Sequence, residues 1–560
     1  MGQGGGIMEV RLIKGPRTSP VDIDIEIDIT LEELVKDYKE ELPYTIIAAK
    51  VNNKIEELTY KLQIPAEIEL LDMRDQAANL IYQYSLSLIY IKAINDVLGK
   101  VHVEIKNSLN KGLFTNIRTL KPVTKEDIQK IETRMREIVK EDLPFIKHVV
   151  DKDTALNQLL SDAQREKIKM LQKVGEIKRV KFYSLGDTCD FFYGMMVPST
   201  SYIEHFELRK YKAGVLLRFP HQKNPDQIPI YVDEKKLYEA FAEETRWSNL
   251  MEVRYVNDLN EKIVSGEYKE LIQLSEAVHE KKIAEIANLI LKENKRIILI
   301  AGPSSSGKTT FARRLCIQLK VNGMKPLYLG TDDYYLERID TPLDEYGEKN
   351  FEDLEAIDIK LFNNQLNDLL EGKTVDIPEF DFFTGMKVFG KRLTKIYAKQ
   401  PIVIEGIHGL NKELTAYLPD EEKFKIYISP FTQLNIDEHN RIPTTDARML
   451  RRIVRDSQFR GYSAKDTIKL WPKVRTGEDK NIFPYSNEAD VLFNSAHIYE
   501  LAVLKKYAEP LLLEIKPEEP EYSEAIRMLK FISFFDIIED DSIIVNNSII
   551  REFIGGSIFV

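Results

Sequence analysis

The chain has 560 residues, enough for three or four domains, and an ordinary globular composition with 43% hydrophobic and 30% charged residues. The formal net charge of -11 argues against a nucleic-acid partner for the whole chain, although the N-terminal regions stay open in this respect. Two cysteines cannot build a disulfide framework, and no apolar run approaches the roughly 18 residues of a membrane span. We therefore expect a cytoplasmic protein that has no membrane contact.

The first 71 residues predict a tail and a small module. Residues 1–8 are glycine-rich and are predicted to form a disordered tail. VDIDIEIDIT, residues 21–30, alternates apolar and acidic residues, as a half-buried strand does, and the Asn-Asn pair in IIAAKVNNKIEELTYKL predicts a hairpin. AAKVNNKIEEL resembles the TGS module of threonyl-tRNA synthetases, which implies a β-grasp-like fold for residues 9–71.

Residues 72–255 mix helical and strand patterns and resemble the second additional domain of threonyl- and alanyl-tRNA synthetases, an α+β editing domain. Threonyl enzymes typically have D-L-C-R-G-P-H-V-P-S-T-G where this chain has Asp190-Phe-Phe-Tyr-Gly-Met-Met-Val-Pro-Ser-Thr-Ser. The four places that hold the family's His, His, Cys and His ligands are here Asp75, Asn79, Phe192 and Met196.

Zinc sites are built from thiolate and imidazole ligands, so we expect neither zinc nor metal-dependent deacylation in this region. An inherited scaffold is the favoured interpretation. A role in binding a nucleoside, an RNA end or another subunit is the alternative. Residues 256–294 are charged, with apolar residues at helical spacing, and predict a helical connector to a domain over residues 295–560.

A buried strand pattern at 297–300 leads into a loop that fits G-x-x-x-x-G-K-[ST] and then into a helical pattern. In this context the backbone N–H groups and the helix N-terminus face phosphates, Lys308 bridges the β- and γ-phosphates, and the Thr309 hydroxyl holds Mg²⁺. The predicted nucleotide-binding residues are Gly302, Pro303, Ser304, Ser305, Ser306, Gly307, Lys308, Thr309 and Thr310.

Two further strand patterns end in acidic residues. PLYLGTDDYYL carries Asp332 and Asp333, and ligand groups gather at the carboxyl ends of strands in α/β sheets. A carboxylate there can accept the proton of an attacking hydroxyl. PIVIEGIHGL places Glu405 at a strand tip, where it would hold Mg²⁺ directly or through water.

TTDARMLRRIVRDSQFRGYS places four arginines on one face of a predicted helix, namely Arg448, Arg451, Arg452 and Arg455. Like charges at this spacing oppose a helix by a few tenths of a kcal/mol per pair. A bound polyphosphate would neutralise them, so we interpret this face as a lid over the transferring phosphate. An ordinary solvated salt-bridge face is the alternative.

GPSSSGKTT, DDYY, EGKTVDIPEFDF, IVIEGIHGL and the R-x-x-R-R-x-x-R-D helix together resemble uridine kinases of the phosphoribulokinase/uridine kinase branch of P-loop proteins. The resemblance covers about residues 296–510 and implies an α/β P-loop kinase domain, a parallel sheet with helices on both faces. It also implies a catalytic base at Asp332, a nucleoside contact at Tyr335, lid arginines at Arg451, Arg452 and Arg455, and a substrate segment at Phe380, Asp381 and Phe382.

The family commonly has S-H-S-R after this substrate segment, and its His contacts the pyrimidine. Here Gly385 stands at the place of that His, which predicts weak selectivity for pyrimidines. The resulting hypothesis is a nucleoside 5′-kinase that uses Mg²⁺ and ATP or GTP. Alternatives are a kinase for a sugar phosphate or a pantothenate-like alcohol, or an RNA-binding regulator with a P-loop switch. A homo-oligomer stays open, and NNSIIREFIGGS adds a basic residue, Arg551, of unassigned role.

Overall fold

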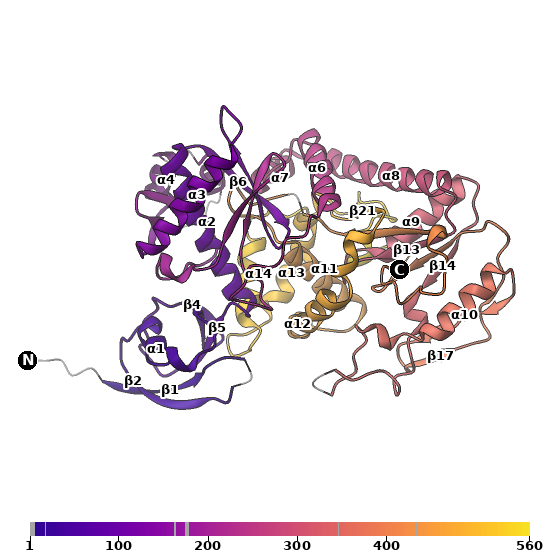
Figure 1. Cartoon of the computed structure of the whole chain (residues 1–560), viewed down its shortest axis with the longest axis horizontal. Coiled ribbons are helices and arrows are strands. Elements are labelled where there is room, and N and C mark those ends of the chain that lie inside the picture. Colours follow the sequence, from indigo (N-terminus) through magenta and orange to yellow (C-terminus); the bar gives the residue numbers. More distant parts are fainter. Residues whose placement is uncertain are drawn as a thin grey trace, which may run out of the picture.

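The computed structural model describes residues 6–16, 18–161, 164–173, 179–344, 347–432 and 434–559. Three structural regions follow one another from the indigo N-terminus to the orange sheet in Figure 1. Within the described ranges, no helix is long and apolar enough to cross a membrane.

The N-terminal module is a five-stranded mixed sheet packed on one helix. Its elements are β1 (Ile7–Ile13), β2 (Val21–Glu26), α1 (Leu31–Asp37), β3 (Ile46–Val51), β4 (Lys54–Glu57) and β5 (Glu67–Asp72). The strand order is β2-β1-β5-β3-β4, in which only the β1–β5 pair is parallel. The β3–β4 hairpin is confirmed, because Asn52 and Asn53 adopt the left-handed conformation that its two-residue turn needs.

Two predicted boundaries in this module need correction. Residues 1–5 of the predicted tail lie outside the described residues, but Ile7 and Met8 already belong to β1. The strand predicted over residues 21–30 ends at Glu26, because a turn follows and Thr30 then caps α1 by accepting a hydrogen bond from the Glu33 N–H.

The second region has two antiparallel sheets around the long helix α2 (Gln76–Leu98). One sheet has the order β11-β12-β7-β6 and the other β10-β9-β8. The strands are β6 (His102–Leu109), β7 (Gly112–Arg118), β8 (Ile146–Asp151), β9 (Arg179–Leu185), β10 (Thr188–Asp190), β11 (Glu207–Tyr211) and β12 (Gly214–Arg218), and the other helices are α3 (Lys125–Lys140), α4 (Lys152–Ser161) and α5 (Arg165–Lys173).

Three helices join this region to the third: α6 (Lys235–Leu250), α7 (Val256–Ser265) and α8 (Tyr268–Lys292). The helical connector therefore begins near Lys235, earlier than the predicted residue 256, and α8 runs along one edge of the molecule in Figure 1. Ile283, Ile286 and Ile290 of α8 are buried against the third region, so the connector is part of its core.

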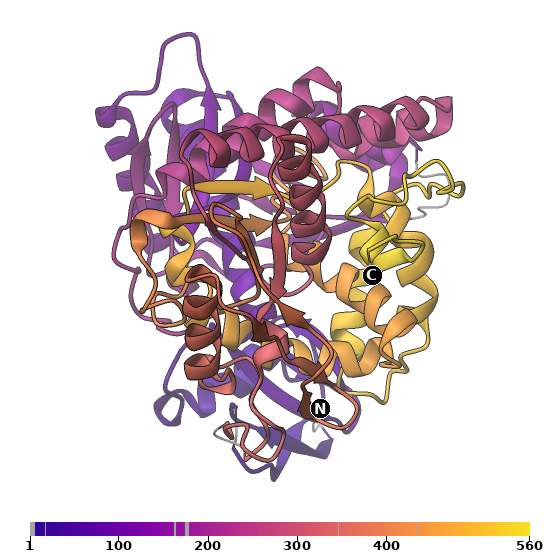
Figure 2. The same cartoon turned by 90° about the vertical axis from the view of Figure 1, so that its right-hand side faces the viewer.

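The third region is built on a five-stranded parallel sheet with the order β14-β19-β13-β20-β21. Its strands are β13 (Ile297–Ala301), β14 (Leu327–Gly330), β19 (Ile402–Glu405), β20 (Lys423–Ser429) and β21 (Val491–Asn494). Alternate residues of β13 point to opposite faces, Ile298 and Ile300 toward α8 and α9 (Lys308–Val321), and Ile297 and Leu299 toward α6 and α10 (Ile359–Leu370). Helices on both faces confirm the predicted α/β architecture (Figure 2).

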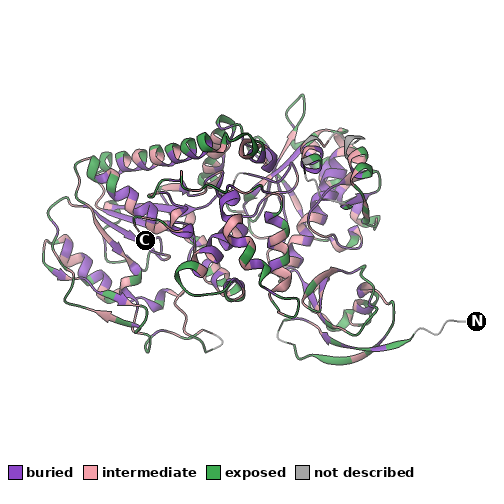
Figure 3. Cartoon of the chain, turned by 180° about the vertical axis from the view of Figure 1, so that it is seen from behind, coloured by how far each residue is buried: buried purple, intermediate pink, exposed green. Residues whose placement is uncertain are grey.

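The C-terminal helices form a third layer between the sheet and the N-terminal regions. These are α11 (Thr444–Phe459), α12 (Ala464–Asn481), α13 (Glu500–Leu513), α14 (Tyr522–Ile532) and α15 (Arg551–Ile554). In Figure 3 much of this layer is buried. The predicted domain 295–560 contacts both N-terminal regions, since Lys530 of α14 donates to the Tyr193 carbonyl and Lys50 of β3 donates to the Pro520 carbonyl at 2.7 Å.

Candidate active site

The loop between β13 and α9 has the shape of a phosphate cradle. Ser305 and Gly307 adopt left-handed φ values of 60° and 83°, which turn the chain sharply before α9 begins at Lys308. A Cβ on Gly302 would collide with the Ile428 carbonyl of β20. The hydroxyls of Ser305 and Ser306 are buried and have no hydrogen-bond partner among the described residues. These unsatisfied donors, together with the N-terminus of α9, fit a polyphosphate.

Thr309 and Glu405 meet where β19 ends beside the cradle. The Thr309 hydroxyl donates to Glu405 Oε1 at 3.1 Å, and the Tyr328 hydroxyl donates to the same oxygen at 3.2 Å. Burial, together with nearby Asp332 and Glu552 and against the pull of Lys308, raises the Glu405 pKa to about 7. Because Mg²⁺ prefers oxygen ligands, these two side chains fit the predicted Mg²⁺ position.

Asp332 lies in a short 3-10 turn just after β14, across from Lys308. Solvent reaches its side chain, but the surrounding protein restricts hydration enough to raise its pKa. Lys308, Arg460 and a hydrogen bond from the Tyr335 hydroxyl act in the opposite direction and favour the carboxylate form. A solvent-accessible carboxylate of this kind can accept a proton.

The neighbouring acid has a different role. Asp333 forms an ion pair with Arg392 at 2.5 Å and accepts a bond from the Phe380 N–H at 3.5 Å. It therefore fixes the chain next to the hairpin β16 (Glu379–Asp381) and β17 (Met386–Val388). Of the two aspartates in the DDYY motif, Asp332 is the one that faces Lys308.

Aromatic side chains form one wall beside Asp332. The Tyr335 ring lies 5.5 Å from Phe351, 5.7 Å from Phe380 and 6.4 Å from Phe382, with edge-to-face geometry in each case. Tyr335 and Phe380 are buried, whereas Phe382 is 61% exposed and can contact a ligand. The structure thus brings together three predicted substrate residues, Tyr335, Phe380 and Phe382.

Asp381, by contrast, is exposed and points into its own turn. It accepts hydrogen bonds from the N–H groups of Phe383, at 2.8 Å, and Thr384, at 3.3 Å, and these bonds lower its pKa. Asp381 therefore shapes the β16–β17 turn, and its predicted role as a substrate ligand has no support from this geometry.

The glycine at position 385 is required by the same turn. Gly385 has φ +73°, and a Cβ built on it would lie 2.6 Å from Arg338 Cβ. A histidine cannot replace it without moving the hairpin, so the local backbone accounts for the absence of the family's imidazole.

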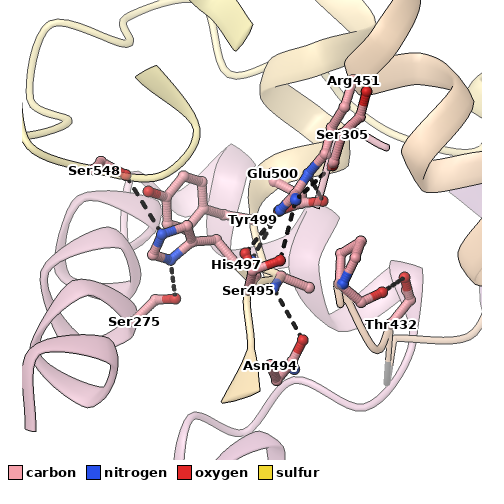
Figure 4. Close-up of polar contacts among 12 residues, drawn as sticks. Ser275, Ser305, Thr432, Arg451, Asn494, Ser495, His497, Tyr499, Glu500 and Ser548 are labelled. Atoms are coloured by element: carbon pink, nitrogen blue, oxygen red, sulfur yellow. Dashed lines mark hydrogen bonds and ion pairs between the residues drawn. The ribbon is translucent and has the colours of Figure 1, made fainter. Parts of the chain in front are cut away.

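The four arginines of α11 do not share one role. Arg448 is buried in a bidentate ion pair with Glu478 and donates to the Ser304 carbonyl at 3.2 Å. Arg451 is buried against Glu500 at 2.6 Å and donates to the carbonyls of Ser305 and Ser495 (Figure 4). The prediction of a common lid face is therefore wrong for these two residues, which hold the cradle by its carbonyl groups.

Arg452 remains at the site. Arg452 donates to the Ser304 hydroxyl at 2.8 Å, and Arg452 and Arg455 both contact Asp456. The structure adds Arg460, at the end of α11, which is close enough to Asp332 to influence its pKa. Arg460 lies outside the periodic run of arginines, so the sequence pattern gives no signal for it.

Two acids that the motifs do not include also lie at the cradle. Glu478 of α12 accepts from the Ser304 N–H at 3.0 Å while it pairs with Arg448. Glu352 lies near Lys308 and Arg452, and burial raises its pKa. No motif pointed to either residue, because long loops and helices separate them from the cradle in the sequence.

The four editing-ligand places in the second region are occupied by structural contacts. Asp75 caps α2 by accepting from the Ala77 N–H at 2.8 Å, and Asn79 accepts from Gln83 at 2.7 Å. Phe192 and Met196 are buried in the core of this region. Phe192 also stacks on His439, which belongs to the loop between β20 and α11 of the third region.

Both halves of the chain are similar to known proteins. The model of the Phosphoribulokinase / Uridine kinase family matches residues 297–502. A uridine kinase of Ligilactobacillus salivarius is 32% identical over 203 residues, 36% of this chain and 86% of that enzyme. A structure described as a possible uridine kinase from Bacillus stearothermophilus covers 38% of this chain and 97% of that chain, with 22% identity and a TM-score of 0.26.

The N-terminal region is similar to a threonine--tRNA ligase of Caldanaerobacter subterraneus subsp. tengcongensis, 28% identical over 185 residues. This match covers 33% of this chain and only 29% of the ligase. The chain belongs to the phosphoribulokinase/uridine kinase family by its C-terminal region. It is a P-loop kinase fold joined to a region that resembles part of threonyl-tRNA synthetases.

Proposed function

We propose that this protein transfers the γ-phosphate of ATP or GTP to the 5′-hydroxyl of a nucleoside. The observation that carries the proposal is the position of Asp332, a solvent-accessible carboxylate that faces Lys308 and accepts a bond from Tyr335. A base opposite the phosphate lysine, next to a wall of aromatic rings, suits a hydroxyl attached to a flat, apolar group.

Each residue of the site has a part in this reaction. Asp332 would take the acceptor's proton as its oxygen bonds to the γ-phosphorus and the diphosphate leaves. Lys308, Arg452 and Arg455 would stabilise the charge that develops on the transferred group. Thr309 and Glu405 would hold Mg²⁺, whose charge offsets that of the phosphates.

The proposal has two competitors. A sugar phosphate or a pantothenate-like alcohol would need the same base and cradle, but the aromatic wall of Tyr335, Phe380 and Phe382 favours an acceptor with a planar base. A P-loop that acts only as a switch for an RNA-binding protein would have no use for a positioned base.

The test is ADP release across a panel of nucleosides, sugar phosphates and pantothenate, with ATP and with GTP, in the absence of RNA. We expect turnover with at least one nucleoside. Lys308→Ala should lower kcat by roughly 10²–10³-fold without changing the melting temperature, because Lys308 acts on the transferring phosphate. Turnover by alcohols other than nucleosides, or no turnover, would refute the proposal.

A further inference from the structure

The end of the chain returns to the phosphate cradle. Ile549, in the segment 546–559, packs so closely on Gly307 that a Cβ at this glycine would collide with it. The Phe553 ring lies 4.9 Å from the guanidinium of Arg451, the residue that holds the Ser305 carbonyl. Ser548 contacts His497 beside the same network (Figure 4). Segment 546–559 is therefore a docked part of the nucleotide site.

One side chain of this segment reaches the first turn of α9. Glu552 Oε2 accepts hydrogen bonds from the Thr310 N–H at 3.2 Å and from the Thr310 hydroxyl at 2.8 Å. Thr310 is fully buried and Glu552 is 8% exposed. The first N–H groups of a helix have no partner within the helix, and in a P-loop they face phosphate oxygens. A carboxylate oxygen thus lies on a donor of the kind that binds phosphate.

The charge of Glu552 is not balanced by a cation. Among the described residues, no lysine, arginine or histidine forms an ion pair with it, whereas Arg551, next in sequence, donates to the carbonyls of Asp541 and Ile544 at 2.7 and 2.8 Å. Glu552 is also close enough to the Glu405 carboxylate to act on it as a like charge. The N-terminus of α9 is thus the main stabilisation of this buried anion.

We propose that Glu552 occupies the position of a phosphate oxygen on Thr310, and that a nucleotide must displace it in order to bind. This inference rests on the proposed function, because it assumes that the P-loop binds a nucleoside triphosphate. Displacement requires only a rotation of the Glu552 side chain, since its hydrogen bonds go to Thr310 alone within the described part of the chain. Ile549 and Phe553 can keep the segment docked meanwhile.

The consequence is that Glu552 sets the affinity for nucleotide phosphates. The negative charge of Glu552 should repel a phosphate strongly at this distance. Glu552→Gln removes this charge but keeps the size of the side chain and an acceptor oxygen. We expect the Kd of ADP to fall about tenfold or more, while that of adenosine stays unchanged. If Glu552 merely positioned Thr310, the same substitution would leave binding unchanged or weaken it.

The experiment is calorimetric titration of the full chain with ADP, ATP, GTP and adenosine, each with and without Mg²⁺. Glu539→Gln, an exposed acid of the same C-terminal region, is the matched control and should bind like the wild type. Glu552→Asp, which withdraws the carboxylate by one methylene group, serves as a second variant and should tighten ADP binding to a smaller extent.

Each outcome decides the matter. Tighter ADP binding by both variants, without a gain for adenosine, supports the inference. Equal or weaker ADP binding by a folded Glu552→Gln or Glu552→Asp protein overturns it, while binding by the wild type keeps the proposed function intact. Absence of ATP and GTP binding by every protein would overturn both.

Discussion

The cradle around Lys308 and the four editing-ligand places of the second region differ in how their side chains are arranged. At the cradle, the hydroxyls of Ser305 and Ser306 are buried without a hydrogen-bond partner among the described residues, and the buried Arg448–Glu478 ion pair supports the loop. At the second site, Phe192 and Met196 fill the interior, and Phe192 packs on a loop of the kinase region. The two places therefore differ in chemistry: the first keeps buried donors without partners, and the second is closed by helix capping and apolar packing.

Loss of the base should give the largest effect on the kinase side of this comparison. Asp332→Asn keeps size and polarity but cannot accept a proton at neutral pH, so kcat should fall by roughly 10²–10⁴-fold. Nucleotide affinity should change little. Steady-state kinetics with the best acceptor, together with nucleotide titration, measures both quantities. Asp333→Asn is the control, since Asp333 pairs with Arg392. Unchanged kcat in Asp332→Asn would remove the base from the scheme.

Substitutions at the four editing-ligand places should change the stability of the protein. Phe192→Ala leaves a cavity in a fully buried place and should lower the free energy of unfolding by about 3–5 kcal/mol. Denaturant unfolding measures this, with exposed Phe383→Ala as the control, for which we expect a change within about 0.5 kcal/mol. Elemental analysis of chelator-washed protein belongs to the same test. One tightly held zinc per chain would contradict a purely structural role for the four editing-ligand places.

Within α11, a pair of variants separates support from chemistry. Arg448→Met removes one of the cations that pair with the buried Glu478 carboxylate and leaves Arg475 at 3.0 Å, so it should cost about 1–3 kcal/mol of stability. Arg452→Met should leave the melting temperature nearly unchanged and lower kcat, because within the described ranges the polar contacts of Arg452 go to the Ser304 hydroxyl and Asp456. The melting temperature should therefore fall more in Arg448→Met, and kcat should fall more in Arg452→Met. If one variant showed the larger loss in both quantities, α11 would act as one unit.

The smallest expected effect concerns pH. The hydrogen bond from Tyr335 lowers the pKa of Asp332, while burial raises it. Tyr335→Phe removes that bond, so the Asp332 pKa should rise and the base should be protonated over a wider acidic range. The acid limb of the profile of log kcat against pH should therefore shift to higher pH, with little change above it. A shift to lower pH would exclude this hydrogen bond.

Sequence patterns predicted the local features well. The strand–loop–helix around Lys308, the Asn52–Asn53 hairpin and the acid at the tip of β19 each depend on residues close together in the chain. The arginine helix was predicted as a helix, but its periodicity could not tell which side faces the core. Burial of Arg448 and Arg451 follows from Glu478 and Glu500, acids 30 and 49 residues further on.

The sequence by itself determined the P-loop and the family of the kinase region, because short motifs encode the backbone turns and donor groups that phosphate needs. Only the tertiary structure decided which charges are buried in pairs and which stay at the site. It also brought Glu552, more than 240 residues after Thr310, to the start of α9. Such contacts depend on how layers pack, and no local pattern records them.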